Sequence, residues 1–342
     1  MDTAAPKTTR SVSSIPVSLV NTATTASSTA TTYIRVIEVW VPDAEGELLV
    51  LGSAWYGAAK RFGALSQQMC FGRGEGLPGQ AWETGRPIVL KQFEGSAFLR
   101  TAAAHADGLT CGIALPLFSG DALNAVMLIF CGDNDTQVGA IELWRNQAEV
   151  SKDLVLDDGY YGSSSNVFEF IARRTAFRKG TGLPGLAWQT GLPVFVEDLG
   201  KGGRFLRADS AIKVGINRGF AIPCSTPGAD SYVMAFLSAL ATPIVRRFES
   251  WLPDADGRQL QRSEGFCESA GVLGLGSAED GVEKGQGALG QAFASGQPML
   301  SQPALNEPGG VGSGARAAGL VTVVALPVLQ HGRVVAVVAW YF

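Results

Sequence analysis

The stretch Gly74-Glu75-Gly76-Leu77-Pro78-Gly79-Gln80-Ala81-Trp82-Glu83-Thr84-Gly85-Arg86-Pro87 returns twice within this chain of 342 residues. Residues 180–193 repeat it as Gly-Thr-Gly-Leu-Pro-Gly-Leu-Ala-Trp-Gln-Thr-Gly-Leu-Pro, and residues 285–298 repeat it more loosely as Gly-Gln-Gly-Ala-Leu-Gly-Gln-Ala-Phe-Ala-Ser-Gly-Gln-Pro. Self-similarity at a regular spacing is typical of a repeated structural unit. The sequence therefore predicts one unit in three copies, the third of them degenerate.

The residues around this motif repeat in step with it. Trp40, Trp144 and Trp251, each in a Glu-x-Trp sequence, lie 36, 38 and 36 residues before the second glycine of the motif. A unit of about 100 residues is large enough to bury a core of its own. We therefore predict three domains, at residues 33–134, 135–242 and 243–342, after a Ser/Thr-rich segment at 1–32. The linkers are short, which predicts a semi-rigid rod.

Composition and charge exclude several classes of partner. The net charge is −4 and no cluster of Lys and Arg occurs, so the basic surface typical of nucleic-acid binding is missing and no nucleic-acid partner is expected. No apolar run reaches the roughly 18 residues of a membrane-spanning helix, so no transmembrane segment is expected. Charged residues make up 17% of the chain. That low share indicates either a surface covered by a partner or a Gly- and Ala-rich compositional bias.

The first 32 residues differ from the rest of the chain. Fifteen of them are Ser or Thr, and Asp2 is the only acidic residue. Such a segment cannot bury enough apolar surface to fold alone, which predicts a disordered tail. A transit peptide is the alternative, because transit peptides are rich in Ser and poor in acids. The expected location is therefore the cytoplasm, or a plastid or mitochondrion if this segment is a targeting signal.

Each copy shows the same order of predicted elements. Alternating residues at 34–40 predict a first strand, and a turn at 42–46 leads into a second. Pro78 suits the first turn of a short helix that Gly85 and Pro87 end. A short strand, a helical segment at 98–106 and two apolar strands at 111–118 and 125–130 follow. The sum is an α+β fold, an antiparallel sheet with short helices packed on one face.

These residues carry a resemblance to a known family. The motif Gly-x-Gly-Leu-Pro-Gly-x-Ala-Trp-x-Thr-Gly-x-Pro, the later Phe-Leu-Arg segment and the Ala-x-Pro before the last strand pair resemble the GAF domain family. The resemblance runs from about residue 33 to the C-terminus and is strongest in the second copy. It implies a fold of three tandem GAF-like domains. Domains of this family bind small ligands, dimerise or, in a few cases, catalyse reactions, so fold alone does not give the function.

The resemblance also implies where a ligand would lie, between the sheet and the short helices. The residues that match this location are Trp82, Phe98 and Arg100 in the first copy and Trp188, Phe205 and Arg207 in the second. An Arg beside aromatic rings could bind an anionic, planar ligand. The alternative is that the Trp is part of the core and the Arg caps a helix or pairs on the surface. The third copy replaces Phe-Leu-Arg with a Gly-rich stretch at 309–314, which predicts that any pocket there is lost.

Catalytic chemistry finds little support in the sequence. The Gly-x-Gly-x-x-Gly pattern resembles a dinucleotide-binding fingerprint, but the helix after it ends too soon for that fold. There are two His residues and no Cys-x-x-Cys pair, so we expect no metal site, no cofactor and no catalytic residues. Three thiols, Cys70, Cys111 and Cys131, leave open a thiol-dependent enzyme of the free methionine sulfoxide reductase type, although strand positions favour inert thiols.

The function expected from the sequence is therefore that of a non-enzymatic protein. We expect an interaction or scaffold protein with protein partners, a subunit of a larger assembly. The first alternative is a small-molecule sensor that uses the pockets of domains 1 and 2. The second alternative is the thiol enzyme.

Overall fold

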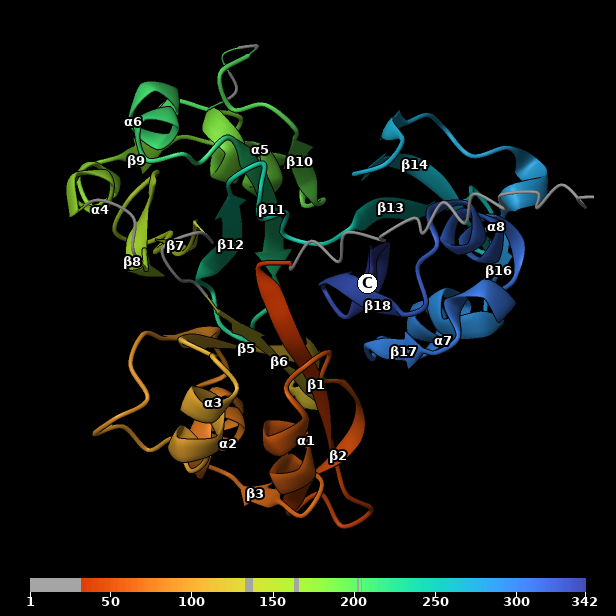
Figure 1. Cartoon of the computed structure of the whole chain (residues 1–342), viewed down its shortest axis with the longest axis horizontal. Helices are drawn as coiled ribbons and strands as arrows, with labels where there is room; N and C mark the ends of the chain where they lie inside the picture. Colours follow the sequence, from red (N-terminus) through yellow and green to blue (C-terminus); the bar gives the residue numbers. More distant parts are fainter. Residues whose placement is uncertain (1–31, 133–137, 163–165, 202, 204) are drawn as a thin grey trace, which may run out of the picture. The chain divides into compact units, whose positions relative to one another are not determined.

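A computed structural model of the chain describes residues 32–132, 138–162, 166–201, 203 and 205–342. The prediction for residues 1–32 lies outside the described part, apart from Thr32. Residues 31–342 form one compact unit. Within it the chain builds three antiparallel sheets, here called the first, second and third sheet (Figure 1). The main path of strands has the same order in all three, the third sheet adds one short strand beside this path, and short helices accompany each of them.

The first sheet has the order β3-β2-β1-β6-β5-β4. Its strands are β1 (Ile34–Pro42), β2 (Leu48–Trp55), β3 (Cys70–Gly72), β4 (Ile88–Leu90), β5 (Cys111–Ser119) and β6 (Ala122–Cys131), and its helices are α1 (Lys60–Ser66), α2 (Gly76–Thr84) and α3 (Thr101–Ala106). Every neighbouring pair of strands is antiparallel. The predicted fold class, an antiparallel sheet with short helices, is confirmed.

The second and third sheets repeat this arrangement. The second contains β7 (Gly139–Asn146), β8 (Leu154–Tyr160), β9 (Ala176–Phe177), β10 (Val194–Val196), β11 (Arg218–Cys224) and β12 (Ser231–Ser238), with α4 (Asn166–Ala172), α5 (Gly182–Thr190) and α6 (Ala208–Lys213). The third contains β13 (Arg247–Pro253), β14 (Gln259–Cys267), β15 (Gly271–Leu273), β16 (Val282–Glu283), β17 (Met299–Ser301), β18 (Val323–Gln330) and β19 (Arg333–Tyr341), with α7 (Gly287–Ser295) and α8 (Gly309–Ala318).

The glycines of the repeated motif are explained by close packing and by turn geometry. A Cβ atom at Gly79 would lie 2.1 Å from the carbonyl oxygen of Gly72, and the matching positions, Gly185 and Gly290, are equally closed by backbone oxygens. Gly85 ends α2 in the left-handed conformation with φ 64°, which a residue with a side chain adopts only at a cost. These requirements account for the motif without a nucleotide.

A β-bulge changes one predicted detail of the first strand. The alternation of residues predicts that Ile34 and Val36 share a face, but the pairing of β1 with β6 shifts between these two residues. Ile34 therefore packs with Ile37, while Val36 packs with Trp40 on the opposite face. An extra residue in one strand reverses the side-chain pattern that precedes it.

Each sheet buries one face under its own helices and the other face against the remaining two sheets. The helix-covered faces enclose separate cores around Trp40, Trp144 and Trp251. The opposite faces share one core that draws residues from all three sheets, for example Ile129, Phe220 and Trp340. The sheets are therefore joined by apolar burial as well as by their linkers.

Three matching contacts, here called the seams, join each sheet to the next. The glycine that ends the motif helix lies against the last hairpin of the following sheet: Gly85 against Pro227, Gly191 against Gln330, and Gly296 against Asn124. Gln330 Nε2 donates to the Gly191 oxygen at 2.8 Å, and Asn124 Nδ2 donates to the Gly296 oxygen at 3.3 Å. The third contact returns from the third sheet to the first. The rod expected from the short linkers is therefore wrong, because the contacts close into a ring.

Candidate functional site

Glu38 and Arg100 form an ion pair inside the first sheet's core, between the sheet and its helices. Glu38 lies on β1, and Arg100 is the residue that precedes α3. Arg100 Nη1 donates to the two carboxylate oxygens of Glu38 at 2.6 and 2.9 Å. The side chains are 0% (Glu38) and 1% (Arg100) exposed. Trp40 Nε1 donates to the same carboxylate at 3.0 Å, and the Tyr56 hydroxyl donates at 3.2 Å.

Aromatic rings surround the guanidinium of Arg100. Its central carbon lies 4.3 Å from the ring centre of Phe62, and four further rings lie within 6 Å: Trp40, Phe71, Phe98 and Phe130. Cation–π attraction is strongest in such a desolvated place. The space where the family resemblance implies a ligand is thus filled by a side chain of the protein itself.

The second sheet holds the same network. Arg207 donates through Nη1 and Nη2 to the two oxygens of Glu142, both at 2.6 Å. Trp144 Nε1 and the Tyr161 hydroxyl donate to this carboxylate at 3.1 and 3.0 Å. The two-pronged geometry is the one that guanidinium and carboxylate groups favour. Here too the cation is buried, with 3% of its side chain exposed.

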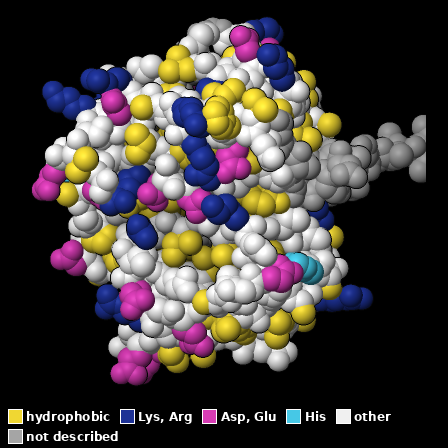
Figure 2. All heavy atoms as spheres, turned by 90° about the vertical axis from the view of Figure 1, so that its left-hand side faces the viewer, with side chains coloured by type: hydrophobic (Ala, Val, Ile, Leu, Met, Phe, Trp, Pro, Cys, Tyr) yellow, Lys and Arg dark blue, Asp and Glu magenta, His cyan; other side chains and the backbone are white. Residues whose placement is uncertain are grey.

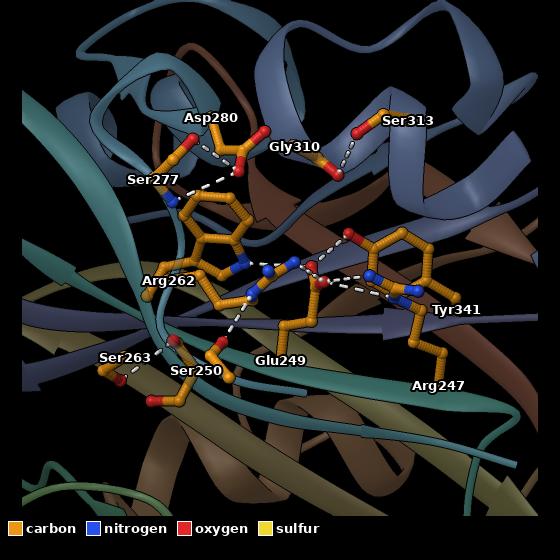
Figure 3. A network of polar contacts seen from close by, with 12 residues as sticks. Arg247, Glu249, Ser250, Arg262, Ser263, Ser277, Asp280, Gly310, Ser313 and Tyr341 are labelled. Atoms are coloured by element: carbon orange, nitrogen blue, oxygen red, sulfur yellow. Dashed lines mark hydrogen bonds and ion pairs between the residues drawn. The ribbon is translucent and has the colours of Figure 1, made fainter. Parts of the chain in front are cut away.

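The third sheet keeps the buried carboxylate but pairs it differently. Figure 3 shows Glu249 between two guanidinium groups: Arg247 Nη2 donates to Oε1 at 2.6 Å and Arg262 Nη1 donates to the same atom at 3.1 Å. The Tyr341 hydroxyl donates to Oε2 at 2.5 Å, and Trp251 Nε1 donates to it at 3.1 Å. The interior of this sheet therefore remains polar and paired, although it lacks the Phe-Leu-Arg segment.

The position of the cation in the backbone has changed between the sheets. One backbone hydrogen bond aligns the three sheets: the amide of a Leu or Ile after the last helix donates to the carbonyl of an Ala within that helix. The residue four before that Ala is Arg100, Arg207 or Val311. The residue two before the buried Glu is Val36, Ala140 or Arg247. In the third sheet, therefore, the Arg and the apolar residue have exchanged places. A Cβ atom at Gly314 would lie 2.5 Å from Arg247 Nη2, so α8 carries a glycine where the relocated Arg needs room.

The six residues predicted from the sequence fall into two groups. Phe98 and Phe205 are buried beside Arg100 and Arg207, with ring-to-guanidinium distances of 5.4 and 5.0 Å. Trp82 and Trp188 are only partly buried, on α2 and α5. The ammonium nitrogen of Lys179 lies 4.9 Å from the ring centre of Trp188, so this ring contacts Lys179 rather than Arg207. The structure therefore brings Phe and Arg together and leaves both Trp residues outside the network.

Sequence reasoning missed the carboxylates. It used Glu38, Glu142 and Glu249 only as markers of spacing, although all three are 0% exposed in the structure. The available signal was a Glu on the strand face that also carries Val36 and Trp40. A charge on a buried face requires a partner. An Arg that recurs at fixed spacing would then have been the first candidate.

The tyrosines beside these carboxylates have raised pKa values. Burial raises the pKa of Tyr56, Tyr161 and Tyr341, and the negative charge of the neighbouring Glu raises each of them further. Both effects oppose formation of a phenolate. The three hydroxyls therefore remain donors to the carboxylates at neutral pH.

The thiols are dispersed. Cys111 and Cys131 face each other across β5 and β6 and are fully buried, while Cys70 is exposed on β3. Burial raises the pKa of Cys224 to about 12. Thiolate chemistry also requires access, and of the three candidate thiols only Cys70 is exposed.

Among the described residues, no group of three or more His, Cys, Asp and Glu side chains is arranged to hold a metal ion. No helix in the described ranges has the length and apolar character needed to cross a membrane.

Several solved structures are similar to about 30% of this chain. A GAF domain described as "A. Aeolicus nlh2 gaf domain in an inactive state" is 24% identical, covers 30% of this chain and 60% of its own, and has a TM-score of 0.24. Free methionine-R-sulfoxide reductase from Neisseria meningitidis, solved with its substrate, is 19% identical over 29% of this chain and 52% of its own, with a TM-score of 0.23. A mutated NreA protein from Staphylococcus aureus, altered in its nitrate binding site, is 16% identical over 32% and 78%, with a TM-score of 0.26.

The match therefore spans little more than half the length of the first two of these structures. No curated protein matches the chain. The family model described as "GAF domain" matches residues 18–148. That range includes β1 to β6, the whole of the first sheet, with Glu38 and Arg100. The chain thus contains a GAF domain, matched over residues 18–148.

Proposed function

We propose that the protein is a non-enzymatic interaction or scaffold protein and a subunit of a larger assembly. The observation that carries this proposal is the closed interior of all three sheets. In each, the space between sheet and helices holds a buried Glu whose carboxylate is paired with Arg, Trp and Tyr. A charged ligand in that space would have to displace a buried ion pair, at a cost of several kcal/mol.

The joined sheets support the proposal as well. Because the shared core and the three seams tie the sheets together, their outer faces keep a fixed relation to one another. Fixed surfaces suit a protein that holds partners, since little conformational entropy is lost on binding. The alternative of a sensor that works through Arg100 and Arg207 would instead require these guanidinium groups to leave their carboxylates.

Exposed apolar side chains on the helices of the second sheet are candidates for partner contact. Val167 and Phe170 on α4 are 62% and 53% exposed, and Ile212 on the neighbouring α6 is 49% exposed. Arg174 covers Phe170, with its guanidinium carbon 3.5 Å from the ring centre. Aromatic residues with an adjacent Arg are typical of interface anchors. On the face drawn in Figure 2, hydrophobic side chains lie in small groups between charged ones. Protein–protein interfaces also combine apolar and polar side chains.

Native mass spectrometry of the protein isolated gently from its source tests the proposal. We expect the chain to appear in a complex with another protein. A chain that appears alone, or with a small molecule and no protein, would contradict the scaffold role. The variant Phe170→Glu with Ile212→Glu should release the partner. The variant Leu65→Glu with Leu99→Glu, which places the same charges on the helix side of the first sheet, is the matched control and should keep it.

A further inference from the structure

The three seams occupy matching places, but the residue after the helix-ending glycine differs. It is Arg86 at the first seam, between the first and second sheets, Leu192 at the second and Gln297 at the third. Gln297 Nε2 donates across its seam to the carbonyl oxygen of Asn124 at 3.0 Å, and Leu192 packs against the shared core. Arg86 is exposed and makes no ion pair or hydrogen bond with its side chain among the described residues. At this position the first seam thus has a cation, and the cation is unpaired.

The loop on the other side of the first seam is longer than its counterparts. In the first and third sheets, two residues join the matching strands, at 120–121 and 331–332. In the second sheet, the six residues 225–230 join β11 to β12. Thr226 Oγ1 donates to the carbonyl oxygen of Asp230 at 3.0 Å within this loop. The longer loop gives the first seam a wall of backbone and small side chains.

A hollow of about 500 Å³ lies between this loop and the end of α2. Arg86 lines it from the first sheet, and Arg145, Tyr232 and the loop residues 226–230 line it from the second. Ligand sites are often found at domain boundaries and typically measure about 300–1,000 Å³. The hollow is therefore large enough for a small molecule that touches both sheets.

The charges in this lining favour an anion. Asp230 is the only acidic residue among the described ones that line the hollow, and Arg145 donates two hydrogen bonds to its carboxylate, at 2.8 and 2.6 Å. Arg145 also lies 3.7 Å from Asp157, which is outside the lining. Within the lining, Arg86 therefore remains as the charge without a counterion. A guanidinium group binds carboxylates and phosphates well, because it can donate two parallel hydrogen bonds to them.

Hydrogen-bond donors accompany this cation. Tyr232 is only 4% exposed, its ring centre lies 5.8 Å from the guanidinium carbon of Arg145, and its hydroxyl makes no hydrogen bond among the described residues. The backbone N–H groups of Gly228 and Ala229 also donate to no described acceptor. Buried polar groups usually have a hydrogen-bond partner, and consecutive free N–H groups suit an anion. These donors are thus available to a ligand oxygen.

From these observations we infer that the hollow at the first seam is a binding site for a small molecule that carries an oxyanion group, a carboxylate or a phosphate. Arg86 supplies the positive charge, and Tyr232 and the loop amides supply hydrogen bonds. The site lies outside the interiors of the sheets and does not involve Arg100 or Arg207. Because Arg86 belongs to the first sheet and the loop to the second, a bound molecule contacts both.

Calorimetric titration of the full chain with inorganic phosphate, at constant ionic strength, tests this inference. We expect saturable binding of one phosphate per chain. Arg86→Leu should bind at least about tenfold more weakly, because hydrogen bonds to a charged group contribute more than the roughly 1.4 kcal/mol that corresponds to tenfold. Arg61→Leu is the matched control, since Arg61 on α1 is also exposed and has no ion pair among the described residues. Its affinity should stay within about twofold of the parent protein.

A second pair of variants changes the opposite wall. A Cβ atom at Gly228 would have no other atom within 4 Å, so Gly228→Glu and Gly228→Gln both have room. The added carboxylate should weaken phosphate binding at least about tenfold, whereas the uncharged Gln of the same size should keep it within about threefold.

Acetate, as the second probe, distinguishes the two kinds of oxyanion, and saturable binding of either probe that depends on Arg86 supports the inference. Three results would overturn it: no saturable binding of either probe, equal affinities in Arg86→Leu and Arg61→Leu, or equal affinities in Gly228→Glu and Gly228→Gln.

Discussion

The first and third sheets pair a matching buried Glu with Arg side chains from different backbone positions. In the first sheet the guanidinium comes from the residue before α3 and the strand contributes Val36; in the third the strand contributes Arg247 and the helix contributes Val311. The phenol has moved as well, from Tyr56 after β2 to Tyr341 on β19. What the two sheets share is the Glu-x-Trp strand.

The two arrangements differ in the donors and agree in the buried carboxylate. A carboxylate that is 0% exposed is costly unless donors surround it, but the donors can come from any element that faces it. The buried Glu is therefore the fixed part of the network, and the cation is the movable part. Four experiments test the roles of the carboxylate, the cation and the phenol.

Removal of the carboxylate should have the largest effect. Glu38→Leu leaves Arg100 buried without its partner, and we expect a loss of about 3–5 kcal/mol in the free energy of unfolding. Urea unfolding measures the loss, and hydrogen exchange of β1 assigns it to the first sheet. The double variant Glu38→Leu with Arg100→Leu is the control and should recover most of the loss. If the single variant unfolds like the parent, the ion pair is not a structural requirement.

Relocation of the cation should come next. Arg100→Val alone leaves Glu38 unpaired and should cost a similar 3–5 kcal/mol, roughly. Adding Val36→Arg and Ala103→Gly places an Arg in the first sheet where the third has Arg247, since Ala103 matches Gly314. The first sheet keeps Leu51 where the third has Arg262. We expect the triple variant to regain at least half of the lost stability in the same urea measurement. No recovery would mean that the two arrangements depend on more than these three positions.

A smaller effect is expected at Gly314. Gly→Ala inside a helix usually adds up to about 1 kcal/mol of stability, but here the added Cβ would crowd Arg247. We expect Gly314→Ala to lower stability by about 1–3 kcal/mol. Thermal unfolding gives the sign. A gain in stability would show that Arg247 moves aside freely and that the glycine serves another purpose.

The last effect, and for any one tyrosine the smallest, concerns alkaline pH. The folded pKa values of Tyr56, Tyr161 and Tyr341 are raised, so their contribution is complete below the unfolded pKa of about 10 and is lost as pH rises toward the folded values. Stability should fall above pH 10 by up to about 1.4 kcal/mol per pH unit for each tyrosine. Urea midpoints between pH 9 and 11 measure this slope. Tyr341→Phe should make the fall of stability with pH less steep. An unchanged slope would mean that the Tyr341 hydroxyl does not donate to Glu249 as a phenol whose pKa is raised.

Much of the architecture was predictable because it rests on local rules. Pro78 favours the start of a helix because its φ is fixed near the helical value, and Gly85 favours its end because glycine can adopt a positive φ. The structure has α2 at Gly76–Thr84. The turn at 42–46 was likewise predictable from its residues, and the structure joins β1 to the antiparallel β2 there. The α+β fold and the GAF domain follow from such signals, because each depends on residues close together in sequence.

The candidate sites were less predictable, because their partners lie far apart in the chain. Glu38 and Arg100 are 62 residues apart, and no local rule links a strand carboxylate to a residue before a later helix. Arg100 and Phe98 were named from the sequence, but as open to a ligand rather than as paired and enclosed. The change in the third sheet is harder still to predict, since the Gly-rich stretch at 309–314 does not indicate that Arg247 supplies the guanidinium for Glu249.

The repeated unit, its elements and their order follow from the sequence alone, since backbone preferences and side-chain alternation act over a few residues. The closing of the sheets into a ring through three seams, and the filling of their interiors by their own ion pairs, emerge only in the folded chain. Burial decides those outcomes, and burial depends on which distant surfaces meet.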